Sequence, residues 1–276
     1  MSKRRSKSRR LLEGIPIGIK DIFCTTDFRT TAGSKILAEF APDFDSTVVA
    51  KLKRSGAIIL GKTETTEFAS FDPSRTRNPW NLHHTPGGSS SGSAVAVATG
   101  MCLAAIGSQT AGSTIRPAAY CGVVGFKPTY GRISRYGIIP GSWSLDHVGI
   151  FTKTARDACT MLEVLAGFDP LDITSLKDKV PPYSKLIGRA SHRKPRLGLL
   201  RDFFYDNSNQ DVKRNIDETV RTLRSKGANI SVKNLPPIFD LVASANRAIM
   251  TSEIAAVHEE IYRLRKKDYG PKIRGR

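Results

Sequence analysis

The chain has 276 residues, of which 39% are hydrophobic and 25% are charged, a composition typical of a globular protein. No apolar run approaches the length of a membrane-spanning helix, and the N-terminal segment MSKRRSKSRRLLEG lacks the apolar core of a secretory signal. The four cysteines form no CxxC pair, which favours reduced thiols and a cytoplasmic protein without a membrane partner.

The net charge of +18 is concentrated at the two ends of the chain. Residues 1–10 hold six Lys/Arg and no acid, residues 11–175 hold fifteen against fourteen Asp/Glu, and residues 176–276 hold twenty-two against eleven. Basic segments bind nucleic acid through its phosphates. Because KRRSKSRR has no interleaved aromatic residues, we interpret residues 1–13 as a basic disordered tail with no specific nucleic-acid partner. A basic nucleic-acid-binding protein stays open as an alternative.

Strand and helix patterns alternate along the chain, which predicts an α/β fold. The expected strands are 15–23, 57–60, 101–110, 196–200 and 229–232, and the expected helices are 45–56, 93–100, 154–167, 208–227 and about 241–267. Residues 168–195 are rich in proline, lysine and polar residues, which indicates a long connecting loop. The resulting prediction is a single domain over 14–276, with a core at 14–170 and a C-terminal α/β part at 196–276.

Two short stretches match known site motifs, but the local structure that the sequence predicts there does not suit either motif. Residues 56–63, GAIILGKT, match the Walker A string, but the middle residues predict a buried strand and not a phosphate-binding loop. Residues 88–92, GSSSG, match the nucleophile elbow GxSxG with Ser90 as nucleophile. The polar NLHHTPGG before it does not predict the strand that an elbow needs. The elbow, with His147 or His192 as base, is therefore the second candidate for the chemistry.

Two glycine–serine turns and one lysine form a stronger pattern. The turns lie in HHTPGGSSSGSA (83–94) and at the start of GSQTAGSTIRPAAYCGVVGFKPTYGR (107–132), and the second directly follows the apolar strand residues 101–106. A short helix and a strand join them, so both turns can lie at one end of a sheet. Lys20 ends the apolar strand GIPIGIKD, where burial lowers the pKa of an amine and keeps it neutral enough to act as a base.

Four blocks in this order resemble the amidase signature family: GIPIGIKD, GAIILGKTETTEFA, RNPWNLHHTPGGSSSGSAVAVATG and GSQTAGSTIRPAAYCGVVGFKPTYGRIS. The resemblance covers about Gly14 to Pro170. It implies an α/β/α sandwich around a mixed β-sheet and a Ser–cis-Ser–Lys triad. On the matching positions, the triad is Lys20 as base, Ser89 as the bridging serine after a cis peptide bond, and Ser113 as nucleophile. The implied oxyanion hole consists of the backbone N–H groups of Thr110, Ala111, Gly112 and Ser113.

The resemblance implies hydrolysis of a carbon–nitrogen bond in a small-molecule linear amide, through an acyl-enzyme on Ser113 and without a cofactor. The adjacent His83 and His84 have no third ligand at metal spacing, so no metal site is expected. A homodimer and the substrate-binding residues stay open. Two alternatives remain within the family: a catalytically inactive amidase-like fragment, and a protein similar to the A subunit of an aminoacyl-tRNA amidotransferase.

The sequence departs from the family pattern in two ways. Gln109 stands where most members have an acid, and Arg116 lies one place later than usual, which argues against a buried ion pair between these positions. Only MSKRRSKSRRLLEG precedes the lysine strand, and the chain stops at KKDYGPKIRGR. We therefore expect a shortened member, incomplete at both ends, that exposes apolar surface and associates with itself.

Overall fold

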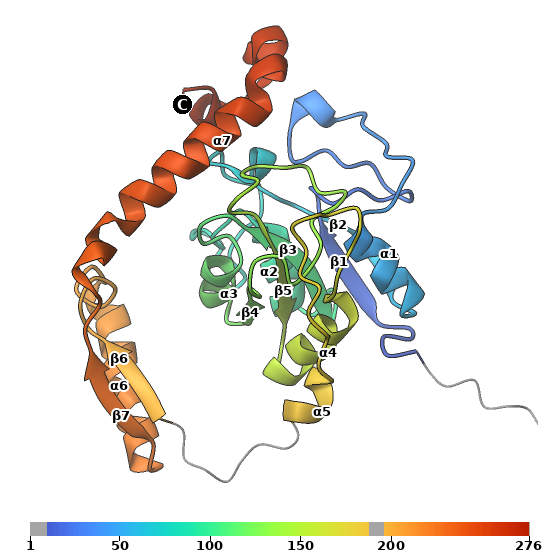
Figure 1. The fold of residues 1–276 in the computed structure, drawn as a ribbon. Helices are drawn as coiled ribbons and strands as arrows, with labels where there is room; N and C mark the ends of the chain where they lie inside the picture. Colours follow the sequence, from blue (N-terminus) through green and yellow to red (C-terminus); the bar gives the residue numbers. More distant parts are fainter. Residues whose placement is uncertain (1–9, 188–195, 276) are drawn as a thin grey trace, which may run out of the picture. The chain divides into compact units, whose positions relative to one another are not determined.

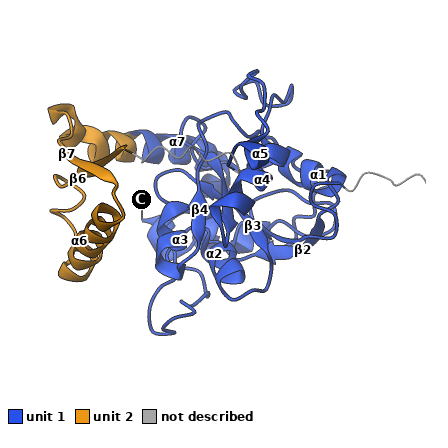
Figure 2. Ribbon diagram, turned by 90° about the horizontal axis from the view of Figure 1, so that it is seen from below, with its two compact units in different colours: residues 1–187, 249–276 blue, residues 188–248 orange. Residues whose placement is uncertain are grey.

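The computed structural model describes residues 10–187 and 196–275. They belong to two compact units, residues 1–187 with 249–276, and residues 188–248 (Figure 2). Within the last long helix, residues from 249 onward belong to the first unit, while 196–248 belong to the second. The single domain over 14–276 stays a prediction.

The first part of the predicted N-terminal tail, residues 1–9, lies outside the described residues. Residues 10–13 form a turn whose Leu12 side chain is buried in the core. The Leu12 N–H donates to the Ser55 carbonyl at 3.0 Å. Residues 10–13, which the sequence analysis assigns to the tail, therefore pack against the first unit.

A five-stranded mixed sheet forms the centre of the first unit, in the order β2-β1-β3-β5-β4 (Figure 1). Its strands are β1 (Pro16–Lys20), β2 (Ile58–Thr63), β3 (Ala104–Gln109), β4 (Val124–Phe126) and β5 (His147–Thr152). Strand β1 runs parallel to β2 and β3, whereas β5 runs antiparallel to β3 and β4. Because Ile19 pairs with Ile106, the carboxyl ends of β1 and β3 lie at the same edge of the sheet.

Helices cover both faces of this sheet. One apolar core joins α1 and α4 to the sheet through residues such as Ile106, and a second joins α2 and α3 to the opposite face through Ala105. Neighbouring strand residues enter different cores because side chains alternate along a strand. The helix bounds are α1 Thr47–Arg54, α2 Ser91–Ala98, α3 Ile115–Cys121 and α4 Ala155–Leu165. The predicted α/β/α sandwich around a mixed sheet is confirmed.

Local signals account for the helices that the sequence predicts. The Ser46 hydroxyl accepts from the Val49 N–H at the start of α1. In α4, the Thr154 hydroxyl accepts from the Asp157 N–H and donates to the Asp157 carboxylate, so the expected pair caps the helix, although the second bond joins two side chains and not the carboxylate to the Thr154 N–H of a capping box. Elements α3, β4 and β5 were not predicted, and the predicted loop 168–195 contains the short helix α5 (Tyr183–Ile187).

The second unit is a small β–α–β motif. Strands β6 (Arg196–Leu200) and β7 (Asn229–Lys233) pair in parallel, and α6 (Gln210–Ser225) connects them. Helix α7 (Val242–Arg265) then crosses the boundary between the units, and α8 (Pro271–Arg274) follows. The 3-10 turns are Lys35–Leu37, Glu67–Ala69, Pro237–Leu241 and Lys266–Asp268. The strands and helix predicted in 196–233 are confirmed.

All four cysteines are free thiols, and three of them are buried. None of the helices in the described parts of the chain combines the length and apolar character that a bilayer crossing requires.

We predict that residues 1–276 self-associate, because both units expose apolar side chains. Ile58 and Leu60 are more than half exposed on the edge strand β2, and α6 exposes Val212 and Ile216 one turn apart. Apolar side chains that share one exposed strand edge or helix face favour association. Size-exclusion chromatography at increasing concentration is expected to show a shift to larger species. A monodisperse monomer at every concentration would contradict this prediction.

Candidate functional site

Lys20 is the titratable group at the centre of the site. It ends β1, its side chain is fully buried, and its Nζ donates to Ser89 Oγ and to Ser108 Oγ, each at 2.7 Å. Ser108 comes from β3, and Ser89 comes from the glycine–serine segment before α2. The parallel pairing of β1 with β3 brings these groups together at one edge of the sheet.

Burial lowers the pKa of Lys20 from 10.5 to about 7, because the protein around the ammonium replaces only part of the hydration that it loses. The nearby Asp146 carboxylate opposes this shift. The pKa therefore lies where the amine can exchange a proton near neutral pH, as the sequence predicts for this lysine.

The serine-rich segment 88–93 is packed tightly against the sheet. The Gly88–Ser89 peptide bond is cis, as expected. Of the other serines, Ser90 donates to the Ser108 carbonyl, Ser91 to the Gly87 carbonyl and Ser93 to the Ile106 carbonyl. These hydroxyls are buried: those of Ser90 and Ser93 bond the turn to β3, and that of Ser91 closes the turn on itself. Ser90 is thus engaged in structural bonds rather than presented as an elbow nucleophile. Gly92 is required because a Cβ there would lie 2.4 Å from the Glu64 nitrogen.

Ser113 lies in the second turn, between β3 and α3. The Ser90 N–H donates to the Ser113 carbonyl at 3.4 Å, so the two glycine–serine turns are neighbours. In the described residues, the Ser113 hydroxyl makes no direct hydrogen bond with Lys20 or Ser89. The structure thus joins Lys20 to Ser89 directly and places Ser113 beside them.

Gln109 closes this turn. Its side-chain oxygen accepts from the N–H groups of Thr114 and Ile115 at 2.9 and 3.0 Å, at the start of α3. Arg116 donates instead to the Gly88 carbonyl, at 2.6 and 3.1 Å. A neutral amide therefore caps the start of α3, while the Arg116 guanidinium bonds a backbone carbonyl.

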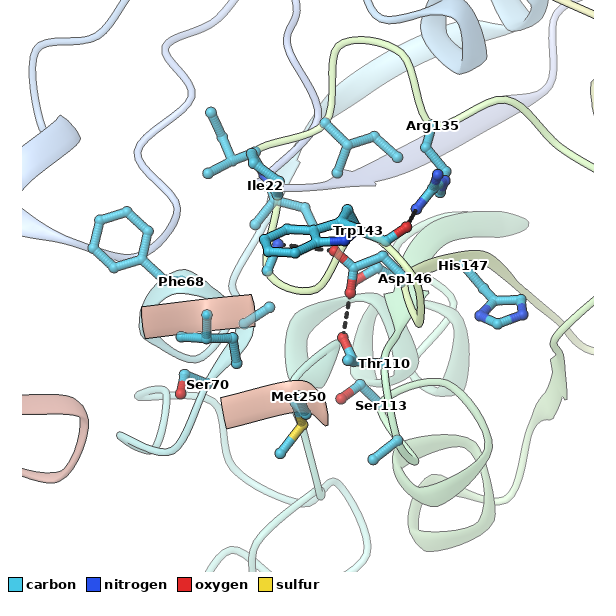
Figure 3. A pocket seen from close by; sticks show the side chains of 18 of the residues that line it. Ile22, Phe68, Ser70, Thr110, Ser113, Arg135, Trp143, Asp146, His147 and Met250 are labelled. Atoms are coloured by element: carbon cyan, nitrogen blue, oxygen red, sulfur yellow. Dashed lines mark hydrogen bonds between the residues drawn. The ribbon is translucent and has the colours of Figure 1, made fainter. Parts of the chain in front are cut away.

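A cavity of about 370 Å³ adjoins the turn (Figure 3). Thr110, Ala111, Gly112 and Ser113 all line it, as does Ser108. Figure 3 shows the Thr110 and Ser113 hydroxyls on one side of the cavity, with Trp143, Phe68 and Met250 around it. The walls come from the 3-10 turn after β2, the segment between β4 and β5, and α7.

The histidines named in the sequence analysis occupy different positions. His147 lines the cavity, its Nδ1 lies 2.6 Å from the Leu145 carbonyl, and burial lowers its pKa. His192 lies outside the described residues. His83 and His84 are exposed on a loop, and no cluster of His, Cys, Asp or Glu within residues 10–187 and 196–275 is arranged to hold a metal ion.

Sequence reasoning missed two residues of this site. Ser108 contacts Lys20 as closely as Ser89 does, and its place at the end of a strand parallel to β1 is the signal that could have found it. Asp146 accepts from the Thr110 hydroxyl at 2.5 Å and from two backbone N–H groups of 141–142. It lies 36 residues from Thr110, and no local pattern connects them.

Comparison with curated proteins identifies relatives over most of this chain. The A subunit of glutamyl-tRNA(Gln) amidotransferase from Koribacter versatilis (strain Ellin345) is 46% identical over 246 residues, which are 85% of this chain and 51% of that protein. The corresponding protein from Desulfatibacillum aliphaticivorans is 45% identical over 230 residues, 81% of this chain and 47% of that protein. The chain thus spans about half the length of the curated relatives it matches.

Solved structures of similar proteins also match most of this chain. The A subunit of glutamyl-tRNA(Gln) amidotransferase from Thermotoga maritima matches with a TM-score of 0.79 and 35% identity, over 91% of this chain and 58% of that one. The native peptide amidase of Stenotrophomonas maltophilia matches with a TM-score of 0.78 and 35% identity, over 92% of this chain and 54% of that one. The model of the Amidase family matches residues 1–274. The chain therefore belongs to the Amidase family.

Proposed function

We propose that the protein hydrolyses the carbon–nitrogen bond of an amide, with Ser113 as nucleophile, Ser89 as proton relay and Lys20 as base. One observation carries this proposal. A fully buried lysine with a pKa of about 7 is bonded to Ser89, next to a cavity that Ser113 lines. A serine hydroxyl needs such a base before it becomes an effective nucleophile.

In the proposed reaction, neutral Lys20 takes the Ser89 proton while Ser89 takes the Ser113 proton. Ser113 Oγ bonds to the amide carbon, and the C=O electron pair moves onto oxygen. When the C–N bond breaks, the proton returns along the relay to the nitrogen and the free amine leaves. Water then adds to the ester through the same relay, which releases the acid and restores Ser113. The Ser113 hydroxyl must rotate toward Ser89 for this transfer, because the two hydroxyls are not bonded in the structure. Catalytic hydrogen bonds often tighten only with substrate bound.

The turn 110–113 supplies the proposed oxyanion hole. Gln109 already occupies the N–H groups of Thr114 and Ile115, so the N–H groups earlier in the turn are those left for a ligand. A preorganised donor to the developing oxyanion is worth about 3 kcal/mol. This arrangement needs no metal and no cofactor.

The cavity favours an uncharged amide. Its four charged lining residues have partners within the protein: Arg116 bonds the Gly88 carbonyl, Arg135 pairs with Asp172, and Asp146 bonds Thr110. Much of the remaining lining is apolar. A substrate that carries an ammonium and a carboxylate would have to compete with these internal partners for the charged groups, which is costly.

A panel of amides tests this proposal through the release of ammonia or amine. We predict a kcat/KM at least about tenfold higher for uncharged aryl or short aliphatic amides than for glutamine or asparagine. Glutamine as the best substrate would favour the second candidate, a protein that resembles the A subunit of an amidotransferase and works with partner subunits. The identities of 45–46% to such proteins support that candidate.

A further inference from the structure

Glu253 is a buried carboxylate that lies outside the proposed relay. It is on the part of α7 that belongs to the first unit, one turn from the cavity-lining Met250 and next to Ile254. Its carboxylate accepts from the Ser142 hydroxyl at 2.5 Å, the Ser144 hydroxyl at 2.6 Å and the Ser144 N–H at 3.0 Å. A buried carboxylate is tolerated only with such donors, so this set is a built contact between α7 and residues 142–144.

The same short segment is bonded to the turn that carries Ser113. Asp146 Oδ2 accepts from the N–H groups of Gly141 and Ser142 at 2.8 and 2.9 Å, and Asp146 Oδ1 accepts from the Thr110 hydroxyl at 2.5 Å. Ser142 belongs to both sets, since its hydroxyl donates to Glu253 and its N–H to Asp146. A continuous path of hydrogen bonds therefore runs from α7 to Thr110.

Trp143 lies at the centre of this segment and forms part of the cavity wall (Figure 3). Its carbonyl accepts from Arg135 at 2.5 Å and from the Tyr130 hydroxyl at 2.8 Å. The backbone of 141–146 is thus held on one side by Tyr130 and Arg135 and on the other by Glu253. Loss of either contact frees one side of the wall.

Helix α7 is itself fixed near the cavity by contacts that do not involve Glu253. His258 Nδ1 lies 2.9 Å from the Tyr269 hydroxyl, and the His258 ring packs edge-on against Phe68, another cavity residue, with centroids 4.5 Å apart. The Gly270 N–H donates to the Glu67 carboxylate at 2.7 Å. Because these contacts hold the helix, Glu253 has a fixed position from which to hold segment 141–146.

We propose that Glu253 is a positioning residue of the site, which holds Thr110 and the proposed oxyanion turn in place through Ser142 and Asp146. The inference rests on the proposed function of the same site, and it adds a residue that no local motif indicates. The competing explanation is a purely structural role, in which Glu253 stabilises the fold without influence on the turn.

A double-mutant cycle separates the two explanations. Glu253→Gln keeps the shape of the side chain and removes its charge, and Thr110→Val removes the hydroxyl that bonds Asp146. The readout is the rate at which a fluorophosphonate labels Ser113, with Glu260→Gln as control because Glu260 is exposed on the same helix. We expect a loss of about tenfold for each single variant, about tenfold for the double variant, and no change for the control. If the two losses multiply in the double variant, the proposal is overturned. It is also overturned if Glu253→Gln lowers the melting temperature but leaves the labelling rate unchanged.

Trp143 fluorescence gives a second readout that does not depend on activity. The chain has two tryptophans, so Trp80→Phe leaves Trp143 as the sole reporter. Glu253→Gln is expected to increase acrylamide quenching of Trp143, and Ser144→Ala, which removes one donor, is expected to do so to a smaller degree. If the unaltered protein is not labelled at Ser113, the proposed function fails, whereas unchanged quenching in both variants would overturn the role of Glu253 by itself.

Discussion

Replacement of Lys20 by methionine is expected to lower kcat/KM for amide hydrolysis by about 10³-fold or more. Methionine fills the buried space with an apolar chain of similar length but has no basic group. Lys20 is the fully buried amine that bonds Ser89 and Ser108, so its loss leaves the proposed nucleophile without a base. Steady-state kinetics with the best amide of the panel measures this effect.

The pH profile gives an independent measure of the same base. With a pKa of about 7, kcat/KM should rise about tenfold per unit below pH 7 and level off above it, since the neutral amine is the active form. The same shift affects stability. Because the folded pKa lies below the unfolded value of 10.5, unfolding takes up a proton between these values, and the free energy of unfolding rises with pH across that window.

His147→Ala is the matched control, since His147 lines the same cavity and has a pKa lowered by burial. The proposed relay predicts less than about a threefold change for this variant. A large loss from His147→Ala with a small loss from Lys20→Met, or a flat pH profile, would contradict a lysine base.

Ser89→Ala is expected to lower kcat/KM by about 10²-fold or more, the second largest effect. Lys20 donates to Ser89 and Ser108 at the same distance of 2.7 Å, so distance alone does not choose between them. Ser89 is proposed to pass the proton, whereas Ser108 holds the amine in place. Ser108→Ala should therefore lower kcat/KM by about tenfold and shift the pKa seen in the pH profile. Ser90→Ala loses a bond to the Ser108 carbonyl and should lower stability more than activity. A larger loss from Ser108→Ala than from Ser89→Ala would assign the relay to Ser108.

The sequence predicts those parts of the site that lie in short local patterns. Lys20 at the end of an apolar strand and the two glycine–serine turns are visible as strings, and parallel strands bring their ends to one edge. Asp146 and Glu253 are not visible in this way. Glu253 lies 109 and 111 residues from the two serines that it contacts, so its role follows only from tertiary packing.

The same distinction holds for the fold. Helices α1, α4 and α6 have caps and apolar stripes within their own sequence, and each was predicted. Strand β4 has only three residues, too few to show an alternating pattern, and β5 is buried almost throughout, so it shows no alternation of apolar and polar residues. The boundary between the two units lies within α7 and not in a segment of linker composition, so no local pattern marks it.

Identification of the labelled serine tests the central claim most directly. The intact 276-residue chain is treated with a fluorophosphonate, digested and analysed by mass spectrometry, with Lys20→Met in parallel. The proposed mechanism predicts the label on Ser113, with a rate that falls sharply in the Lys20→Met protein. A label on Ser90, or labelling of Ser113 that is independent of Lys20, would contradict it.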